Sequence, residues 1–247
     1  MAVLTGKTAV VTGGSRGIGR AIVERLARDG AQVVFNYARS AEAAADVVRT
    51  VETAGGSAWA VRLDLADAGA AERLMETADE RLGGLDILVN NAALSFTPAP
   101  LAETDEEVFD RVMAVNTKSA FLTLRYAARR LRDHGRVVNI STLNTVRPAP
   151  GSAPYAASKG AIEQLTLVAS RELGRRGITV NTVSPGATDT DLLREANPGV
   201  DFAPVVAVTP LGRLGRPSDV ADVVAFLAGP DGRWLTGQNL RATGGLG

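Results

Sequence analysis

The sequence predicts an α/β fold in a single domain, with a mostly parallel, doubly wound sheet that carries helices on both faces. Two observations carry this prediction. Short β-branched runs alternate with stretches of helical period, and 247 residues that are 45% hydrophobic suffice for one substantial core. The strand-like runs cover residues 8–12, 32–37, 58–63, 85–90, 136–141 and 178–184.

Helical periods separate these runs. After the first run, apolar residues keep the three- and four-residue spacing of a helix with one buried face. The same spacing recurs after the third run. The two sets are Ile18, Ala21, Ile22 and Leu26, then Ala71, Leu74, Met75, Ala78 and Leu82. Because sheets of this class hold ligands outside the C-terminal ends of their strands, we expect the functional residues at that edge.

Two proline-rich loops and one longer irregular segment belong to the same edge. Residues 97–100 and 147–154 follow the fourth and fifth strands, which predicts loops on the functional rim. Residues 185–217 form the longest irregular piece and contain one short helical candidate at 191–195. This length and its many prolines and glycines predict a substrate lid around residues 186–217.

Composition argues against several classes of function. Lys plus Arg and Asp plus Glu both number 27, so no basic excess indicates nucleic acid or an anionic membrane surface. The absence of cysteine removes thiolate chemistry and suits a reducing, cytoplasmic setting. No apolar stretch is long enough to span a membrane, and the single histidine, His134, lies in a turn-like link. We therefore expect small-molecule chemistry without a metal, because zinc sites and Ser-His-Asp triads both need a placed imidazole.

A glycine-rich loop, Thr-Gly-Gly-Ser-Arg-Gly-Ile-Gly from residue 12, follows the first strand. Its glycines at 13, 17 and 19 allow a tight turn and a close approach of the backbone to a pyrophosphate. The phosphate would lie at the N-terminus of a helix that begins near Ile18. The alternative is a strand-to-helix turn that binds nothing, because a lone motif of this kind is weakly specific.

The end of the second strand indicates which dinucleotide would bind. An NAD enzyme usually has an acidic residue there to hold the ribose 2′-hydroxyl, but this chain has Asn36 and Tyr37. Arg39 and Arg16 could instead grip a 2′-phosphate with charge-assisted hydrogen bonds, which predicts NADP(H). The alternative is that both arginines are solvated surface charges.

Tyr155 and Lys159 lie one helical turn apart on a stretch that follows the fifth strand. A free tyrosine has a pKa of about 10, and a nearby ammonium group favours the phenolate, so we expect this pKa to move toward neutrality. Such a phenol can exchange a proton with a carbonyl or alcohol oxygen. The pair is common on ordinary helices, but its position after a glycine-rich loop predicts nicotinamide-dependent carbonyl reduction.

These motifs together resemble the short-chain dehydrogenase/reductase family. The resemblance rests on T-G-x-x-x-G-x-G at the first strand, N-N-A-A at residues 90–93, Y-x-x-x-K, and P-G-x-x-x-T at residues 185–190, and it extends from residue 8 to about residue 245. It implies a Rossmann fold with a seven-stranded sheet and a homotetramer joined through helix pairs and the C-terminal region. The near-apolar tail at 234–247 is compatible with burial at a subunit contact.

The resemblance also implies roles for individual residues. Thr142 stands where the family has a serine that hydrogen-bonds the substrate oxygen, and the neighbouring Ser141 would point to the opposite side. Asn116 corresponds to an asparagine that holds a water linked to the lysine, and its alternative role is to stabilise a helix kink. The catalytic set is therefore Asn116, Thr142, Tyr155 and Lys159. The cofactor set comprises Gly13, Ser15, Arg16, Gly17, Ile18, Gly19, Asn36, Tyr37, Arg39, Asp64, Leu65, Asn91, Ala92, Tyr155, Lys159, Pro185, Gly186, Thr188 and Thr190.

The set of motifs as a whole most resembles that of 3-oxoacyl-[acyl-carrier-protein] reductases. This resemblance implies a 3-oxoacyl group on a carrier protein or coenzyme A as the leading substrate. Two alternatives are a reductase or dehydrogenase of a free ketone, polyketide, sugar or cyclic alcohol, and a non-catalytic NADP(H)-sensing module. Arginine clusters at 129–132 and 175–176 could meet an acidic carrier protein or be solvated helix ends. The predicted pocket rim comprises Leu94, Ser95, Phe96, Leu143, Asn144, Arg147, Leu192, Leu193 and Phe202.

Overall fold

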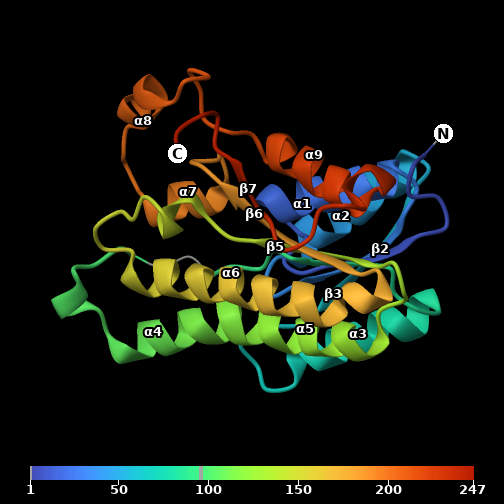
Figure 1. Ribbon diagram of the computed structural model, residues 1–247. Helices are drawn as coiled ribbons and strands as arrows, with labels where there is room; N and C mark the ends of the chain where they lie inside the picture. The colour runs from blue at the N-terminus through green and yellow to red at the C-terminus, as the bar shows by residue number, and fades with distance from the viewer. Residues whose placement is uncertain (1, 95–96) are drawn as a thin grey trace.

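One seven-stranded sheet runs through the protein, with every neighbouring pair of strands parallel (Figure 1). The computed structural model describes residues 2–94 and 97–247. The strands follow the order β3-β2-β1-β4-β5-β6-β7, so the order reverses between β1 and β4. Their bounds are β1 (Thr8–Val11), β2 (Gln32–Tyr37), β3 (Ser57–Arg62), β4 (Ile87–Asn90), β5 (Arg136–Ile140), β6 (Thr179–Pro185) and β7 (Asn239–Ala242).

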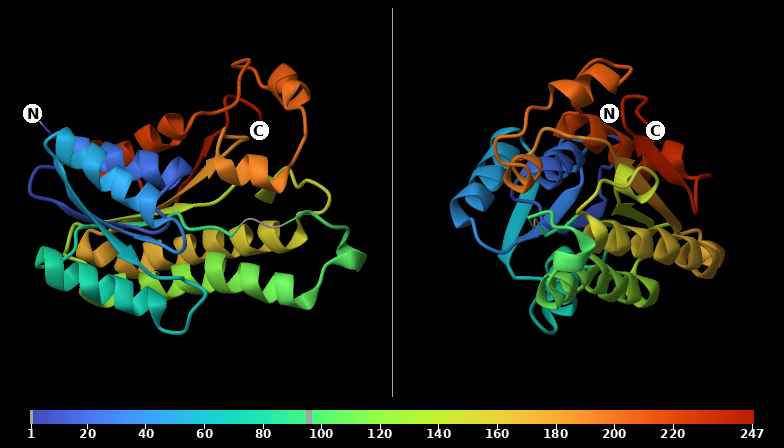
Figure 2. Two further views of the ribbon diagram at one scale, coloured as in Figure 1. Left: turned by 180° about the vertical axis from the view of Figure 1, so that it is seen from behind. Right: turned by 90° about the vertical axis from the view of Figure 1, so that its left-hand side faces the viewer.

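Helices cover both faces of this sheet, as Figures 1 and 2 show, which confirms the predicted doubly wound Rossmann fold. On one face lie α1 (Gly17–Arg28), α2 (Ala41–Thr53) and α9 (Pro217–Ala228), and on the other lie α3 (Ala70–Leu82), α5 (Ser119–Arg130) and α6 (Ala153–Leu173). The shorter elements are η1 (Leu101–Glu103), α4 (Glu106–Val112), the π-helical η2 (Met113–Lys118), η3 (Leu143–Thr145), η4 (Gly174–Arg176), α7 (Asp191–Ala196), α8 (Ala203–Val208) and η5 (Pro230–Gly232).

Two hydrophobic cores flank the central strands. On β1, Ala9 and Val11 face the core shared with α1, α2 and α9, whereas Val10 faces the core shared with α3, α5 and α6. All three side chains are fully buried. Burial on both faces explains why the strand reads as a continuous apolar run instead of an alternating one. Among the residues that the structure describes, no helix combines the length and apolar character needed to cross a bilayer.

The C-terminal region differs most from expectation. Residues 239–242 form β7 beside β6 and complete the predicted seven-stranded sheet, although the apolar runs of the sequence located six of its strands and left the seventh without a position. The strand was missed because it has only four residues and half of them, Asn239 and Arg241, are polar and exposed. Trp234 is 93% exposed in the single chain.

The irregular segment after β6 begins and ends at one place, because residues near its two ends pair with each other. Thr188 forms an isolated bridge with Gly215, supported by hydrogen bonds from Gly215 N to Ala187 O (2.9 Å) and from Asp189 N to Gly215 O (2.8 Å). Between these contacts lie α7, which covers the helical candidate at 191–195, and α8, which the sequence did not predict. In Figure 1, α8 lies at the outer end of the segment.

Candidate active site

The predicted site residues gather where β1, β4, β5 and β6 end, at the C-terminal edge of the sheet. The glycine-rich loop leaves β1, Asn91 and Ala92 follow β4, Thr142 follows β5, and Pro185 ends β6. This edge lies at the point where the strand order reverses. Such a point is where open α/β sheets bind ligands.

Two asparagines hold the glycine-rich loop in shape. Asn36 Oδ1 accepts a hydrogen bond from Gly13 N (2.9 Å), and its Nδ2 donates to Leu63 O (2.9 Å). Asn91 Nδ2 donates to Thr12 O (2.9 Å) and to Gly13 O (3.1 Å). Both side chains were predicted to contact cofactor, but here their polar atoms brace the loop.

The loop needs its glycines for its own conformation. Gly13 and Gly17 have φ angles of 67° and 53°, a region that disfavours other residues. A Cβ at Gly19 would lie 2.1 Å from Gly13 O, and a Cβ at Gly14 would lie 2.6 Å from Phe35 Cβ. The loop therefore packs too closely at the start of α1 to admit a side chain at Gly14 or Gly19.

The N-terminus of α1 is suited to an anion. Its N-cap residue, Arg16, makes no side-chain capping hydrogen bond, and the first turn contains no acidic residue. The positive end of the helix dipole is thus not neutralised by the helix itself. Together with the glycine cradle, this arrangement fits the pyrophosphate of a dinucleotide, and the partly exposed Ser15 and Ile18 lie in the same turn.

The two arginines predicted to bind a 2′-phosphate are both exposed, and within residues 2–94 and 97–247 only Arg16 of the two has a side-chain partner. Arg39 follows β2 and Tyr37. Arg16 Nη1 lies 2.6 Å from Glu195 Oε1, and Nη2 lies 3.3 Å from Glu195 Oε2. This ion pair joins the glycine-rich loop to α7 of the segment after β6.

On the adenine side predicted after β3, Asp64 and Leu65 make local contacts. Asp64 Oδ1 accepts from Ala66 N (3.0 Å), and Leu65 is buried in the core shared with α3. Burial of Leu65 anchors the chain just after β3, which ends at Arg62, and the turn at Asp64 lies between the two.

Thr142 and Tyr155 lie together in the centre of the site. A hydrogen bond joins their hydroxyl groups, and Thr142 Oγ1 also accepts from Asn144 N (3.2 Å). Ser141 points elsewhere, because its Oγ donates to Glu163 Oε1 (2.7 Å). The structure therefore places the threonine hydroxyl, and not that of the preceding serine, beside the phenol.

Lys159 lies beneath Tyr155 and is 1% exposed. Its Nζ donates to Ile140 O (2.8 Å) and is 5.8 Å from the centroid of the Tyr155 ring. Burial lowers the pKa of Lys159 to about 8, because the surroundings disfavour the charged form.

The pKa of Tyr155 moves in the direction opposite to our expectation. Burial of the phenol raises this pKa, and the hydrogen bond with Thr142 opposes the rise only in part. The expected lowering by Lys159 does not prevail, because desolvation of the phenol is the largest influence on its pKa. Tyr155 is therefore a protonated phenol at neutral pH, which is the form that can donate a proton to a carbonyl oxygen.

Asn116 lies in η2, where the helix between α4 and α5 widens into π geometry. Its Oδ1 accepts from Leu94 N (2.8 Å), and its Nδ2 donates to Ser158 Oγ (3.0 Å). Ser158 Oγ in turn donates to Tyr155 O (2.7 Å). Asn116 thus connects the loop after β4 with the helix that carries Tyr155 and Lys159, a link that the sequence did not reveal.

The segment after β6 borders the glycine-rich loop. Gly186 N donates to Ala242 O (3.0 Å), and the buried Thr188 Oγ1 donates to Gly186 O (3.0 Å). Thr190 caps α7 by accepting from Leu193 N (3.2 Å), and its Cγ2 would lie 3.3 Å from a Cβ at Gly17. This segment therefore lies against the glycine-rich loop. Of the predicted pocket rim, Ser95 and Phe96 lie outside the described residues.

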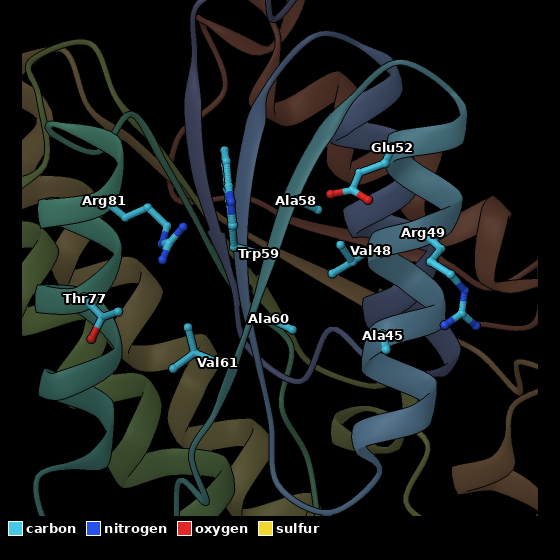
Figure 3. A pocket seen from close by; sticks show the side chains of 10 residues that line it. All are labelled: Ala45, Val48, Arg49, Glu52, Ala58, Trp59, Ala60, Val61, Thr77 and Arg81. Carbon is cyan, nitrogen blue, oxygen red and sulfur yellow. The ribbon is translucent and has the colours of Figure 1, made fainter.

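A separate groove of about 460 Å³ lies along β3, the strand at the sheet edge, between α2 and α3 (Figure 3). The Arg81 guanidinium stands 5.6 Å from the ring centroid of Trp59 at its rim. No predicted site residue lines this groove, so we do not place the active site there.

Known proteins resemble this chain along its whole length. A family model described as enoyl-(acyl carrier protein) reductase matches residues 13–247. An oxidoreductase of Methylorubrum extorquens is 44% identical over 248 residues, covering 100% of both chains. A short-chain dehydrogenase/reductase from Serratia marcescens is 44% identical with a TM-score of 0.93 and 99% coverage of both chains. The angucycline C-6 ketoreductase LanV, solved with bound NADP, is 44% identical with a TM-score of 0.92, covering 99% of this chain and 96% of its own.

The matches cover the glycine-rich loop, the Tyr155–Lys159 helix and the segment after β6 in one alignment. Their identity lies far above the level at which a shared fold alone would be concluded. The chain therefore belongs to the short-chain dehydrogenase/reductase family of oxidoreductases.

Proposed function

We propose that the protein is an NADPH-dependent reductase that converts a ketone into a secondary alcohol. The observation that carries this proposal is the hydrogen-bonded pair of hydroxyl groups on Thr142 and Tyr155, with the buried Lys159 behind it. Two adjacent donors can hold one carbonyl oxygen, and the glycine-rich loop supplies a dinucleotide site on the same sheet edge.

In the proposed mechanism, Thr142 and Tyr155 orient the substrate through its carbonyl oxygen. Bound NADPH supplies the hydride. As negative charge develops on the carbonyl oxygen, the Tyr155 phenol donates its proton to that oxygen. The raised pKa of Tyr155 keeps this proton available at neutral pH. We propose that Lys159 and Asn116 position the phenol and connect it with a route for its reprotonation.

We propose that the glycine-rich loop and the α1 N-terminus hold the pyrophosphate, and that Arg16 and Arg39 hold the 2′-phosphate. The solved relative with bound NADP supports this choice of cofactor. The chain offers no carboxylate at Asn36 or Tyr37 that would repel a phosphate. We further propose that Asp64 and Leu65 border the adenine and that residues 185–190 border the nicotinamide.

Arg39→Asp should reverse part of the cofactor preference. Each charge-assisted hydrogen bond contributes about 1.5–3 kcal/mol, so we expect the ratio of kcat/KM for NADPH over NADH to fall by at least about tenfold. Steady-state kinetics with both cofactors measure this ratio. Arg28→Asp is the matched control. It makes the same charge change at an exposed position, at the end of α1 that is remote from the glycine-rich loop. An unchanged ratio in Arg39→Asp would mean that Arg39 does not contact the phosphate.

Two substrate classes are supported. The description of the family model favours an acyl thioester, so a 3-oxoacyl group on coenzyme A or a carrier protein is the first candidate. The resemblance to an angucycline ketoreductase favours a ring ketone of the polyketide type as the second. The arginine clusters at 129–132 and 175–176 add little support for binding of a carrier protein, because three of these arginines are already in ion pairs. These pairs are Arg130 with Asp79, Arg132 with Asp86, and Arg176 with Asp133.

A substrate panel tests the proposed function. NADPH oxidation should be measured with acetoacetyl-coenzyme A, an acetoacetyl carrier protein, and acyclic and cyclic free ketones. We expect turnover with at least one ketone, and the ranking of kcat/KM separates the two classes. NADPH binding without turnover of any compound would indicate the sensing module and contradict the reductase.

We also propose a cytoplasmic homotetramer. The cysteine-free sequence suits a reducing compartment, and the outer faces of α4, α5 and α6 expose large apolar side chains. These side chains are Phe109, Phe121, Leu167 and Val168, with exposures of 42%, 45%, 40% and 55%. Light scattering that gives the mass of a monomer would contradict the assembly, and recovery in a membrane or exported fraction would contradict the location.

A further inference from the structure

Glu163 connects the catalytic helix with the loop that carries Thr142. It lies on α6 one turn beyond Lys159, and the partly buried carboxylate turns toward the end of β5. Its Oε1 accepts hydrogen bonds from Ser141 Oγ (2.7 Å) and from Thr145 Oγ1 (2.7 Å). These two donors flank Thr142 in the sequence. One carboxylate oxygen therefore holds the chain both before and after Thr142.

The loop has few other ties to α6. β5 ends at Ile140, Ser141 N still donates to Val183 O of β6 (2.8 Å), and the backbone bonds of the turn that follows are local, such as Val146 N to Leu143 O (3.0 Å). Ser141 Oγ also approaches Lys159 O, but at the longer distance of 3.4 Å. Besides the bond between Thr142 and Tyr155, the two hydroxyls held by Glu163 thus provide the short side-chain contacts that join this loop to the helix.

We propose that Glu163 is a positioning residue for ketone reduction, which sets the place of the Thr142 hydroxyl relative to the Tyr155 phenol. The inference rests on the proposed function. Tyr155, Lys159 and Glu163 follow one another at four-residue intervals, so one face of α6 carries the proton donor, the buried amine and the anchor for the second hydroxyl. A single substrate oxygen must meet both hydroxyls, and a misplacement of about 1 Å can cost about 100-fold in rate.

Three variants separate this role from a general effect on folding. Glu163→Ala removes the acceptor and should lower kcat by about 10- to 100-fold while leaving KM for NADPH unchanged. Glu163→Gln keeps an oxygen that can accept both hydroxyl protons and should retain most of the activity. Glu172→Ala, at an exposed position on the same helix, should behave as the wild type.

A combined variant tests the route through the two hydroxyls. Ser141→Ala with Thr145→Val removes the donors instead of the acceptor and should lower kcat as Glu163→Ala does. Adding Glu163→Ala to this pair should cause little further loss, because all three changes break the same contacts. Independent, multiplicative losses would overturn the proposal, as would equal losses in Glu163→Ala and Glu163→Gln.

An NMR titration provides a measurement that does not depend on turnover. The chain has three tyrosines, so ¹³Cζ-tyrosine labelling gives few signals, and Tyr155→Phe assigns the relevant one. The Thr142 hydroxyl favours the phenolate of Tyr155, so displacing it in Glu163→Ala should raise the Tyr155 pKa above that of Glu163→Gln, which removes the same negative charge but keeps the acceptor oxygen. Lys159, whose Nζ is 5.8 Å from the centroid of this ring, is unchanged in all variants.

The outcomes for the two proposals are distinct. If the wild type reduces no ketone but the Tyr155 pKa rises in Glu163→Ala alone, the proposed function fails and the positioning role stands. If the wild type reduces a ketone while kcat and the Tyr155 pKa are the same in Glu163→Ala, the positioning role is refuted and the function stands.

Discussion

Tyr155→Phe should lower kcat for ketone reduction by about 10²- to 10⁴-fold, which is the contribution of a positioned general acid. The affinity for NADPH should stay close to that of the wild type. Phenylalanine keeps the ring and removes only the hydroxyl, so the loss reports the proton donor and not the packing of α6. Steady-state turnover of the best ketone and a fluorescence titration with NADPH measure the two quantities.

Tyr126 supplies the matched control. Its hydroxyl donates to Asp79 Oδ2 (2.9 Å), and burial together with this carboxylate raises its pKa to about 12. Tyr126→Phe should keep full kcat and lose about 1 kcal/mol of unfolding free energy, the usual contribution of a hydrogen bond. Wild-type turnover by Tyr155→Phe would remove the phenol from the mechanism.

The same phenol determines the pH dependence of the wild-type enzyme. Reduction needs protonated Tyr155, and burial raises the pKa of this group above its ordinary value. We therefore expect kcat for reduction to be level through neutral pH and to fall at alkaline pH, first as Lys159 loses its charge near its pKa of about 8 and then as the phenol deprotonates. A decline in kcat that begins below neutral pH would contradict the role of protonated Tyr155 as the proton donor.

Gly19→Ala should weaken NADPH binding and catalysis by about 100-fold. The added Cβ would lie 2.1 Å from Gly13 O and 2.5 Å from Asn91 Nδ2, so the loop or the start of α1 must shift. A shift of about 1 Å is enough for a loss of this size. Overpacking also costs about 1–3 kcal/mol of stability, which a thermal unfolding curve will show as a lower Tm.

Gly160→Ala is the control for this substitution. Gly160 lies within α6, and a Cβ there would meet nothing within 4 Å. Alanine favours the helix over glycine by about 1 kcal/mol, so this variant should be slightly more stable and fully active. If Gly19→Ala binds NADPH as the wild type does, the close packing of the glycine-rich loop is not needed for the cofactor.

The sequence predicted the fold because the central strands are buried on both faces. Six apolar runs matched β1 to β6 to within two residues at each end, since such strands leave a continuous apolar signal. β7 and α8 lack this signal. β7 is half exposed, and the six residues of α8 carry no buried face.

The site was predicted in part for a similar reason. The separation of Tyr155 and Lys159 is fixed by helix geometry, so the spacing alone placed them together. The opposite orientations of Ser141 and Thr142 followed from the alternation of an extended chain. The contacts of Glu163 cross from α6 to the loop after β5, and the direction of the Tyr155 pKa shift depends on burial, so neither could be deduced from local spacing.

The ion pair between Arg16 and Glu195 affects the order in which ligands bind. A guanidinium that holds the carboxylate on α7 must release it before gripping a phosphate with the same hydrogens. Under the proposed cofactor assignment, dinucleotide uptake and detachment of α7 are then thermodynamically linked, and each favours the other. Both partners are 48% exposed, which limits the linkage to about 1 kcal/mol, or several-fold in affinity. Under the predicted lid role of residues 186–217, NADPH binding would thus loosen α7 before the ketone binds, which corresponds to an ordered kinetic scheme with the nucleotide first.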